Sequence, residues 1–212
     1  MAELEIHQGT DALLLIDLQP DFMPGGALAV AEGDQILPLV NELAGRFEHV
    51  LLTQDWHPEG HISFASRHGR ANYERISVVY GEQTLWPDHC LIDTPGAQIH
   101  SGVAIPHVEL VLRKGFRREI DSYSAFLEND HVTPTGLAGY LRERGITRLF
   151  LAGLAYDFCV RFSAEDGTRA GFECVVIEDA CRAVGLPGTV AATNDSFAGM
   201  GVMRVSSGQV GS

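Results

Sequence analysis

Short apolar runs alternate with amphipathic stretches along most of the chain. The apolar runs predict six strands, at residues 12–16, 50–52, 109–112, 148–152, 173–177 and 201–205. Between these runs, apolar side chains recur at helical spacing and predict helices at residues 34–47, 135–144, 157–170 and 189–198. Gly145 and Gly171 stand where the second and third of these helices should end.

The order and character of these elements predict the fold class. Strands that are apolar on both faces and alternate with helices are typical of a parallel sheet that is buried on both sides. We therefore predict an α/β fold of three layers, α/β/α, with a six-stranded, mainly parallel sheet and helices on both faces. We expect a single domain over residues 1–212, with its core at about residues 11–205.

One long interval interrupts the alternation. Residues 57–107, between the second and third predicted strands, are rich in Gly, Pro, His and aromatic residues. Loops of this length in compact domains are usually either functional or disordered. The aromatic content is too high for a disordered segment. We therefore expect an ordered excursion that forms one wall of a pocket.

Composition narrows the range of functions. The chain has 212 residues and a net charge of -13, from 15 basic and 28 acidic residues. This balance disfavours nucleic acid and anionic membranes as partners, because both need clustered Lys and Arg. No apolar run is long enough to span a membrane, and the first residues contain no signal-peptide core, so we expect a cytoplasmic protein. The four cysteines lack a C-x-x-C pattern and are interpreted as free thiols.

Polar residues follow three of the predicted strands. Asp17 and Lys114 come after the first and third strands, and Cys159 follows the fourth strand across a short turn. In open α/β sheets, ligands bind at this carboxyl edge. A helix N-terminus and a nearby lysine both lower the pKa of a thiol. We therefore expect Cys159 to be a reactive nucleophile whose proton is taken by Asp17, whereas core packing is the alternative for a lone cysteine.

A second group of polar residues follows the second predicted strand. Asp55, His57 and His61 lie within seven residues of one another. These oxygen and nitrogen donors suit a divalent ion such as zinc or iron(II), provided that a further ligand comes from elsewhere in the chain. The alternative interpretation of this segment is a polar, solvated loop.

Taken together, six short motifs resemble the nicotinamidase family of isochorismatase-like cysteine hydrolases. In chain order they are IDLQPDF (16–22), GGAL (25–28), QDWHP (54–58), WPDHC (86–90), KG (114–115) and GLAYDFCV (153–160). The resemblance spans about residues 11–205. It implies hydrolysis of nicotinamide to nicotinate and ammonia through a thioester, with pyrazinamide as a further substrate.

The resemblance also implies a role for each matching residue. Cys159 matches the nucleophile, Asp17 the general base and acid, and Lys114 the third member of the triad. The matches to the metal ligands are Asp55, His57 and His89, and His61 is expected beside them without binding the ion itself. The implied ion is a single divalent metal: zinc, iron(II) or manganese.

Two further features are implied in the same way. The N–H groups of Ala155 and Cys159 are expected to form an oxyanion hole, with a cis peptide bond between Leu154 and Ala155. The residues expected to line the substrate pocket are Phe22, Leu28, Trp86, Tyr123 and Tyr156. Tyr156 stands where the family often has Thr. The expected partner is a small aromatic carboxamide, and a homo-oligomer is left open.

Two alternative functions share parts of this pattern, and two others are disfavoured by missing motifs. A metal-independent amidohydrolase of the carbamoyl or ureidoacrylate type would share Asp17, Lys114 and Cys159 but would not need the metal ligands. A binding module of this fold without activity would not need Cys159. A serine hydrolase or a dinucleotide-binding enzyme is disfavoured, because the chain has neither a G-x-S-x-G nor a G-x-G-x-x-G motif.

Overall fold

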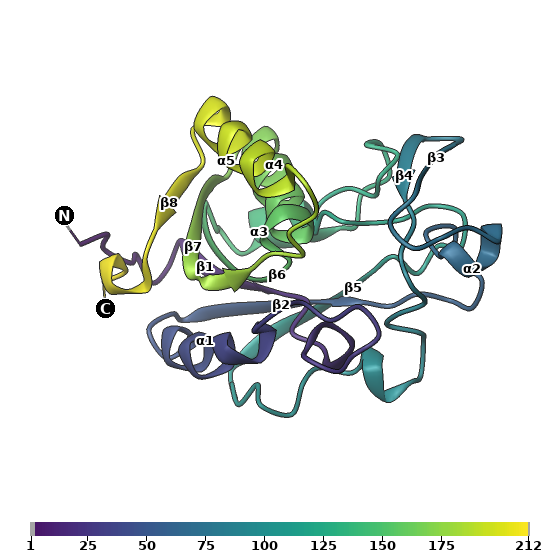
Figure 1. Ribbon diagram of the computed structural model, residues 1–212. Coiled ribbons are helices and arrows are strands. Elements are labelled where there is room, and N and C mark those ends of the chain that lie inside the picture. The colour runs from purple at the N-terminus through teal and green to yellow at the C-terminus, as the bar shows by residue number, and fades with distance from the viewer. Residues whose placement is uncertain (1–2, 212) are drawn as a thin grey trace.

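The computed structural model describes residues 3–211 of the chain. Its main element is a six-stranded sheet in the order β5-β2-β1-β6-β7-β8, in which all neighbouring strands are parallel (Figure 1). The strands are β1 (Asp11–Ile16), β2 (His49–Asp55), β5 (Val108–Lys114), β6 (Arg148–Leu154), β7 (Glu173–Arg182) and β8 (Met203–Val205). The predicted α/β sheet is confirmed, and most strands are longer than predicted.

Helices cover both faces of this sheet, as predicted. On one face lies α1 (Leu37–Ala44), and on the other lie α3 (Leu137–Glu143), α4 (Arg161–Arg169) and α5 (Thr189–Met200) (Figure 1). Successive side chains of a strand point to opposite faces, so β1 contributes to two cores. Leu13 and Leu15 pack in the core that contains α1, whereas Leu14 and Ile16 pack in the core that contains the other three helices.

Two of the predicted helices begin differently from expectation. The helix predicted at residues 34–47 starts as a 3-10 turn, Gly33–Ile36, and continues as α1. The helix predicted at residues 157–170 starts as one π-helical turn, Tyr156–Val160, before α4. In this turn the Ala155 carbonyl accepts the N–H groups of both Phe158 (3.0 Å) and Val160 (3.1 Å). Cys159 therefore lies in a wide turn, and α4 begins two residues after it.

The long excursion at residues 57–107 is ordered. It contains the short helix α2 (Ala65–His68) and an antiparallel hairpin, β3 (Arg75–Val78) and β4 (Gly81–Thr84), which lie together at one end of the sheet (Figure 1). The sequence did not predict this hairpin, because its strands are short and largely exposed. Phe64 and Trp86 are buried beneath it and pair through a backbone bridge. Within residues 3–211, no helix has the length and hydrophobicity of a membrane-spanning segment.

The sheet brings the ends of four adjacent strands, β5, β2, β1 and β6, close to level with one another. Asp55 at the end of β2 pairs with Lys114 at the end of β5. Ile16 at the end of β1 pairs with Gly153 near the end of β6. The residues that end or follow these four strands therefore converge on one edge of the sheet, where open α/β folds bind their ligands.

Gly153 is required by the close approach of β1 and β6 at this edge. Its φ is +123°, and a Cβ atom there would lie 2.2 Å from the Ile16 carbonyl oxygen. We expect Gly153→Ala to lower the free energy of unfolding by about 1–3 kcal/mol from backbone strain alone, measured by urea denaturation. In Gly139→Ala the new methyl group meets nothing within 4 Å, so its stability should not fall. Equal stability of the two variants would contradict this account of Gly153.

Candidate active site

Lys114 is the centre of a buried polar cluster. Its Nζ atom lies 2.9 Å from Asp17 Oδ2 and also donates to Asp55 Oδ1. The same ammonium group donates to the Ser122 carbonyl oxygen at 3.0 Å and contacts Cys159 Sγ at 3.4 Å. The structure thus brings Asp17, Lys114 and Cys159 together, although Lys114 stands 97 positions after Asp17 and 45 positions before Cys159 in the sequence.

The strands fix the carboxylates of this cluster. Asp17 follows β1 with a positive φ of 52°. Its backbone N–H donates to Thr53 Oγ1 at 3.1 Å, and that hydroxyl donates to Asp17 Oδ1 at 2.6 Å. The Gln19 side chain bonds the backbone of Asp55 on both sides, accepting its N–H and donating to its carbonyl oxygen, each at 2.8 Å. Both acids are therefore held by side-chain contacts between β1 and β2.

The two carboxylates of this cluster differ in the direction of their pKa shifts. Burial would lower the pKa of Lys114, but Asp17 and Asp55 together outweigh burial and raise it well above its usual range. Burial raises the pKa of Asp17, and the attraction of Lys114 offsets this effect only in part. Burial acts in the same direction on Asp55, but Lys114 and His57 hold its pKa well below the usual range. Asp17 is therefore the carboxylate best suited to take up and return a proton.

The prediction that the pKa of Cys159 is lowered is wrong. Burial raises the pKa of the Cys159 thiol well above its usual range; Lys114 acts in the opposite direction, and the negative charges of Asp17 and Asp55 add to the effect of burial. Lys114 is shared between two carboxylates, and α4 begins only at Arg161. The thiol therefore keeps its proton until a base accepts it. Asp17 is close enough for that role, since its carboxylate lies within 4.8 Å of the sulfur.

Asp55, His57 and His89 form a set of donors that fits a metal ion. Asp55 Oδ2 lies 3.4 Å from His57 Nε2 and 3.7 Å from His89 Nε2. The Nδ1–H of His57 donates to the Gly115 carbonyl at 2.9 Å, and that of His89 donates to the Pro87 carbonyl at 2.8 Å. These bonds leave both Nε2 atoms facing the Asp55 carboxylate. Backbone acceptors orient metal-binding histidines in this way in known metal sites.

His61 lies next to this set. Its ring stacks on that of His57 with the centroids 4.3 Å apart. Its Nε2–H donates to the Ile120 carbonyl at 3.2 Å, and its Nδ1 accepts from the Ser63 hydroxyl at 2.8 Å. Burial lowers the pKa of His61 to about 4, so the ring is neutral near pH 7. Both ring nitrogens are thus engaged by protein groups.

A small cavity adjoins both the Cys159 thiol and the donor set. It has a volume of about 30 Å³ and is bordered by Asp55, His57, His89, Ala155 and Cys159. Four of the five residues predicted to line the substrate pocket also line it: Phe22, Leu28, Trp86 and Tyr123. The peptide bond between Leu154 and Ala155 is cis, as the resemblance implied.

Tyr156 does not line this cavity, contrary to expectation. Its hydroxyl group donates to Asn194 Oδ1 of α5 at 2.6 Å, and its ring packs edge-on against Phe197. The side chain therefore points to the face of the sheet that α5 covers. The reason is the wide turn after β6, in which neighbouring side chains point in different directions.

Three residues that the sequence did not single out complete the cavity wall: Asp121, Phe158 and Val184. Asp121 is 2 % exposed, and its carboxylate accepts Gln83 Nε2 of the unpredicted hairpin at 2.8 Å. Phe158 precedes Cys159 within a recognised motif, so that motif offered a signal. Asp121 and Val184 lie in irregular segments and offered none.

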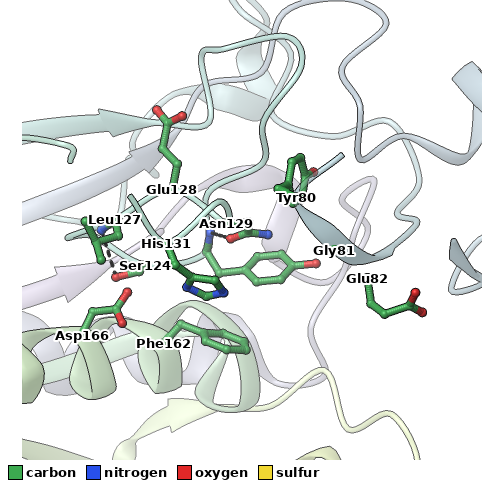
Figure 2. A pocket seen from close by; sticks show the side chains of 11 residues that line it. Tyr80, Gly81, Glu82, Ser124, Leu127, Glu128, Asn129, His131, Phe162 and Asp166 are labelled. Atoms are coloured by element: carbon green, nitrogen blue, oxygen red, sulfur yellow. Dashed lines mark hydrogen bonds between the residues drawn. The ribbon is translucent and has the colours of Figure 1, made fainter. Parts of the chain in front are cut away.

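A larger cavity lies on the other side of Tyr123. Its volume is about 300 Å³, and Figure 2 shows Phe162 and Asp166 on one side of it, with His131 above them. Apart from Tyr123, its lining contains none of the predicted catalytic, metal-binding or pocket residues. Size alone would therefore point away from the buried polar cluster, which adjoins the small cavity at the sheet edge.

Comparisons with known proteins agree with this geometry. Residues 11–207 match the isochorismatase domain family. The chain is 47% identical over 209 residues to the nicotinamidase of Acinetobacter baylyi, covering 98% of each protein.

Solved structures give the same result. The nicotinamidase/pyrazinamidase of Acinetobacter baumanii is 49% identical, with a TM-score of 0.93 over 94% of this chain and 97% of that one. PnC1 of L. infantum in complex with nicotinate is 37% identical, with a TM-score of 0.87 and 98% of each chain covered. The pyrazinamidase of Pyrococcus horikoshii in complex with zinc is 34% identical, with a TM-score of 0.76 over 92% of this chain and 98% of that one. The chain therefore belongs to the isochorismatase family, and five curated relatives that are 31–47% identical to it are named nicotinamidase or nicotinamidase/pyrazinamidase.

Proposed function

We propose that this chain is a metal-dependent cysteine amidohydrolase that converts nicotinamide and water to nicotinate and ammonia, and that it also hydrolyses pyrazinamide. The observation that carries the proposal is the position of Lys114. Its ammonium group joins a proton acceptor, a thiol and a metal-ligand carboxylate in one contact set. The aromatic side chains that line the cavity beside Cys159 are of the kind that pack against a flat pyridine or pyrazine ring.

The reaction follows from the roles of the buried groups. Asp17 takes the thiol proton as Cys159 Sγ attacks the carboxamide carbon, and the N–H groups of Ala155 and Cys159 stabilise the oxyanion. Asp17 then gives its proton to the departing ammonia, which leaves a thioester. Asp17 next removes a proton from water as the water attacks the thioester, and it returns that proton to the departing Cys159 sulfur. The nicotinic acid so formed loses a proton to solvent and leaves as nicotinate.

Asp55, His57 and His89 are the residues that would hold the metal ion, and their donors suit zinc, iron(II) or manganese. A bound ion would supply a Lewis acid able to accept the ring nitrogen and so to orient the substrate. Phe22 packs edge-on against His89, with the ring centroids 5.5 Å apart, so the aromatic wall and the metal ligands are adjacent. His61 would hold the ring of His57 in place by stacking.

Removing the nucleophile should abolish turnover without closing the cavity. We expect Cys159→Ala to lower the rate of ammonia release from nicotinamide by at least about 10⁴-fold, while binding of the ring, followed by calorimetry, changes little. Cys174→Ala is the matched control, because Cys174 is also buried but lies outside the cavity. A Cys159→Ala protein that turns over at the wild-type rate would refute the mechanism.

Metal content should depend on the histidines of the donor set. We expect His57→Ala and His89→Ala each to lower the metal bound per chain, measured by elemental analysis after dialysis, and to lose activity in consequence. His49→Ala is the control, since His49 pairs with Glu109 away from the site. If both site variants kept the wild-type metal content, the proposed ligand set would be wrong.

The pH profile should report the raised pKa of Asp17. A base must be deprotonated to act, so kcat/KM should fall as the pH drops through a value above the ordinary aspartate pKa of about 3.9. The Thr53 hydroxyl donates to the Asp17 carboxylate and so lowers this pKa. We therefore expect Thr53→Val to move the acidic limb of the profile to higher pH. An unmoved limb would argue against Asp17 as the base.

A further inference from the structure

Asp157 is a buried acid that the proposed reaction does not use. It lies in the π-helical turn between Ala155 and Cys159 and is 1 % exposed. Its Oδ1 accepts the backbone N–H of Val184 at 2.9 Å. Its Oδ2 accepts the N–H of Gly185 at 2.9 Å and the Thr189 hydroxyl at 2.5 Å. Three donors thus hold one carboxylate, which no cation contacts within residues 3–211.

The partners of Asp157 all belong to one segment, the connection from β7 to the first residue of α5. This connection, residues 183–188, has no regular secondary structure and contains Gly185 and Gly188, both with positive φ. Val184 of the same connection lines the small cavity. The Asp157 carboxylate therefore joins the turn that carries the nucleophile to the segment that forms part of the cavity wall.

The position of Asp157 in the turn determines which reacting groups this contact would hold in place. Asp157 is two residues from Ala155 and two residues from Cys159, the two residues expected to supply the oxyanion donors. A second hydrogen bond, from the Tyr156 hydroxyl to Asn194 of α5, also joins the turn to this part of the chain. Displacement of reacting groups by about 1 Å can cost on the order of 10² in rate.

We propose that Asp157 is a positioning residue, which holds the nucleophile turn and the Val184 wall in register so that Cys159 meets the substrate carboxamide. The inference rests on the proposed amidohydrolase function. It predicts an effect on kcat rather than on KM, because the ring-binding side chains Phe22, Trp86 and Tyr123 come from other segments.

The test compares Asp157→Asn with Asp130→Asn. Asp130 is a matched control, since its carboxylate also accepts two backbone N–H groups and a threonine hydroxyl, from Val132 (3.0 Å) and Thr133 (2.9 Å and 2.6 Å). It lies outside the small cavity. We expect Asp157→Asn to lower kcat for nicotinamide about 10- to 100-fold, with KM within about threefold of wild type. Asp130→Asn should leave both constants unchanged.

A second measurement does not depend on the substrate. Hydrogen–deuterium exchange should accelerate in Asp157→Asn in two peptides at once, those that cover residues 155–160 and 183–189. In Asp130→Asn, acceleration should stay within residues 128–135. If the wild-type protein released no ammonia from nicotinamide, the proposed function would fail, while the exchange data would still test the coupling.

Several outcomes would overturn the inference. Acceleration at residues 183–189 alone, with kcat unchanged, would mean that Asp157 only holds the connection. A rise in KM at constant kcat would also overturn the inference. So would an equal loss of kcat in Asp157→Asn and Asp130→Asn. If Asp157→Asn does not fold, Thr189→Val removes one of the three donors and keeps the carboxylate. That variant should show a smaller loss of kcat, and an unaltered kcat would overturn the inference.

Discussion

The site depends on one buried cation. The Lys114 side chain has no solvent-exposed surface, and a lone ammonium group would be very costly to bury there. Asp17 and Asp55 make this burial tolerable by giving the ammonium two carboxylate partners. In return, Lys114 allows both acids to approach the same point without mutual repulsion. Removal of Lys114 would leave two buried carboxylates facing each other without a cation, whereas removal of either acid would leave a single ion pair.

Lys114 contacts two aspartates that suit different roles. Asp55 also faces two histidines, so its pKa is low and it suits a metal ligand. Asp17 has no comparable second partner, and burial keeps its pKa high enough for proton transfer. Neither role is a property of an aspartate by itself. Both roles follow from the order of the strands, which places β2 between β1 and β5.

The sequence was sufficient where strands and motifs position a residue. Asp17, Asp55 and Lys114 end or follow strands, so a parallel sheet brings them to one edge regardless of the loops. It was insufficient where irregular backbone decides the outcome. The direction of Tyr156 depends on a wide turn, and the place of Asp121 depends on the hairpin of β3 and β4. The thiol pKa depends on the balance between burial and three charges, which a linear motif does not contain.

The contact between His57 and Gly115 restricts how this site can change during evolution. Gly115 directly follows Lys114, its carbonyl orients His57, and a Cβ atom at Gly115 would lie 2.4 Å from the His57 ring. The end of β5 therefore serves the proton-transfer cluster and the metal ligands through consecutive residues. A side chain at Gly115 would displace the His57 ring, and loss of Lys114 would remove the cation that Asp17 and Asp55 share, so a shift of this strand end would reach both halves of the site. Descendants of this chain would have to inherit them as a unit or rebuild both.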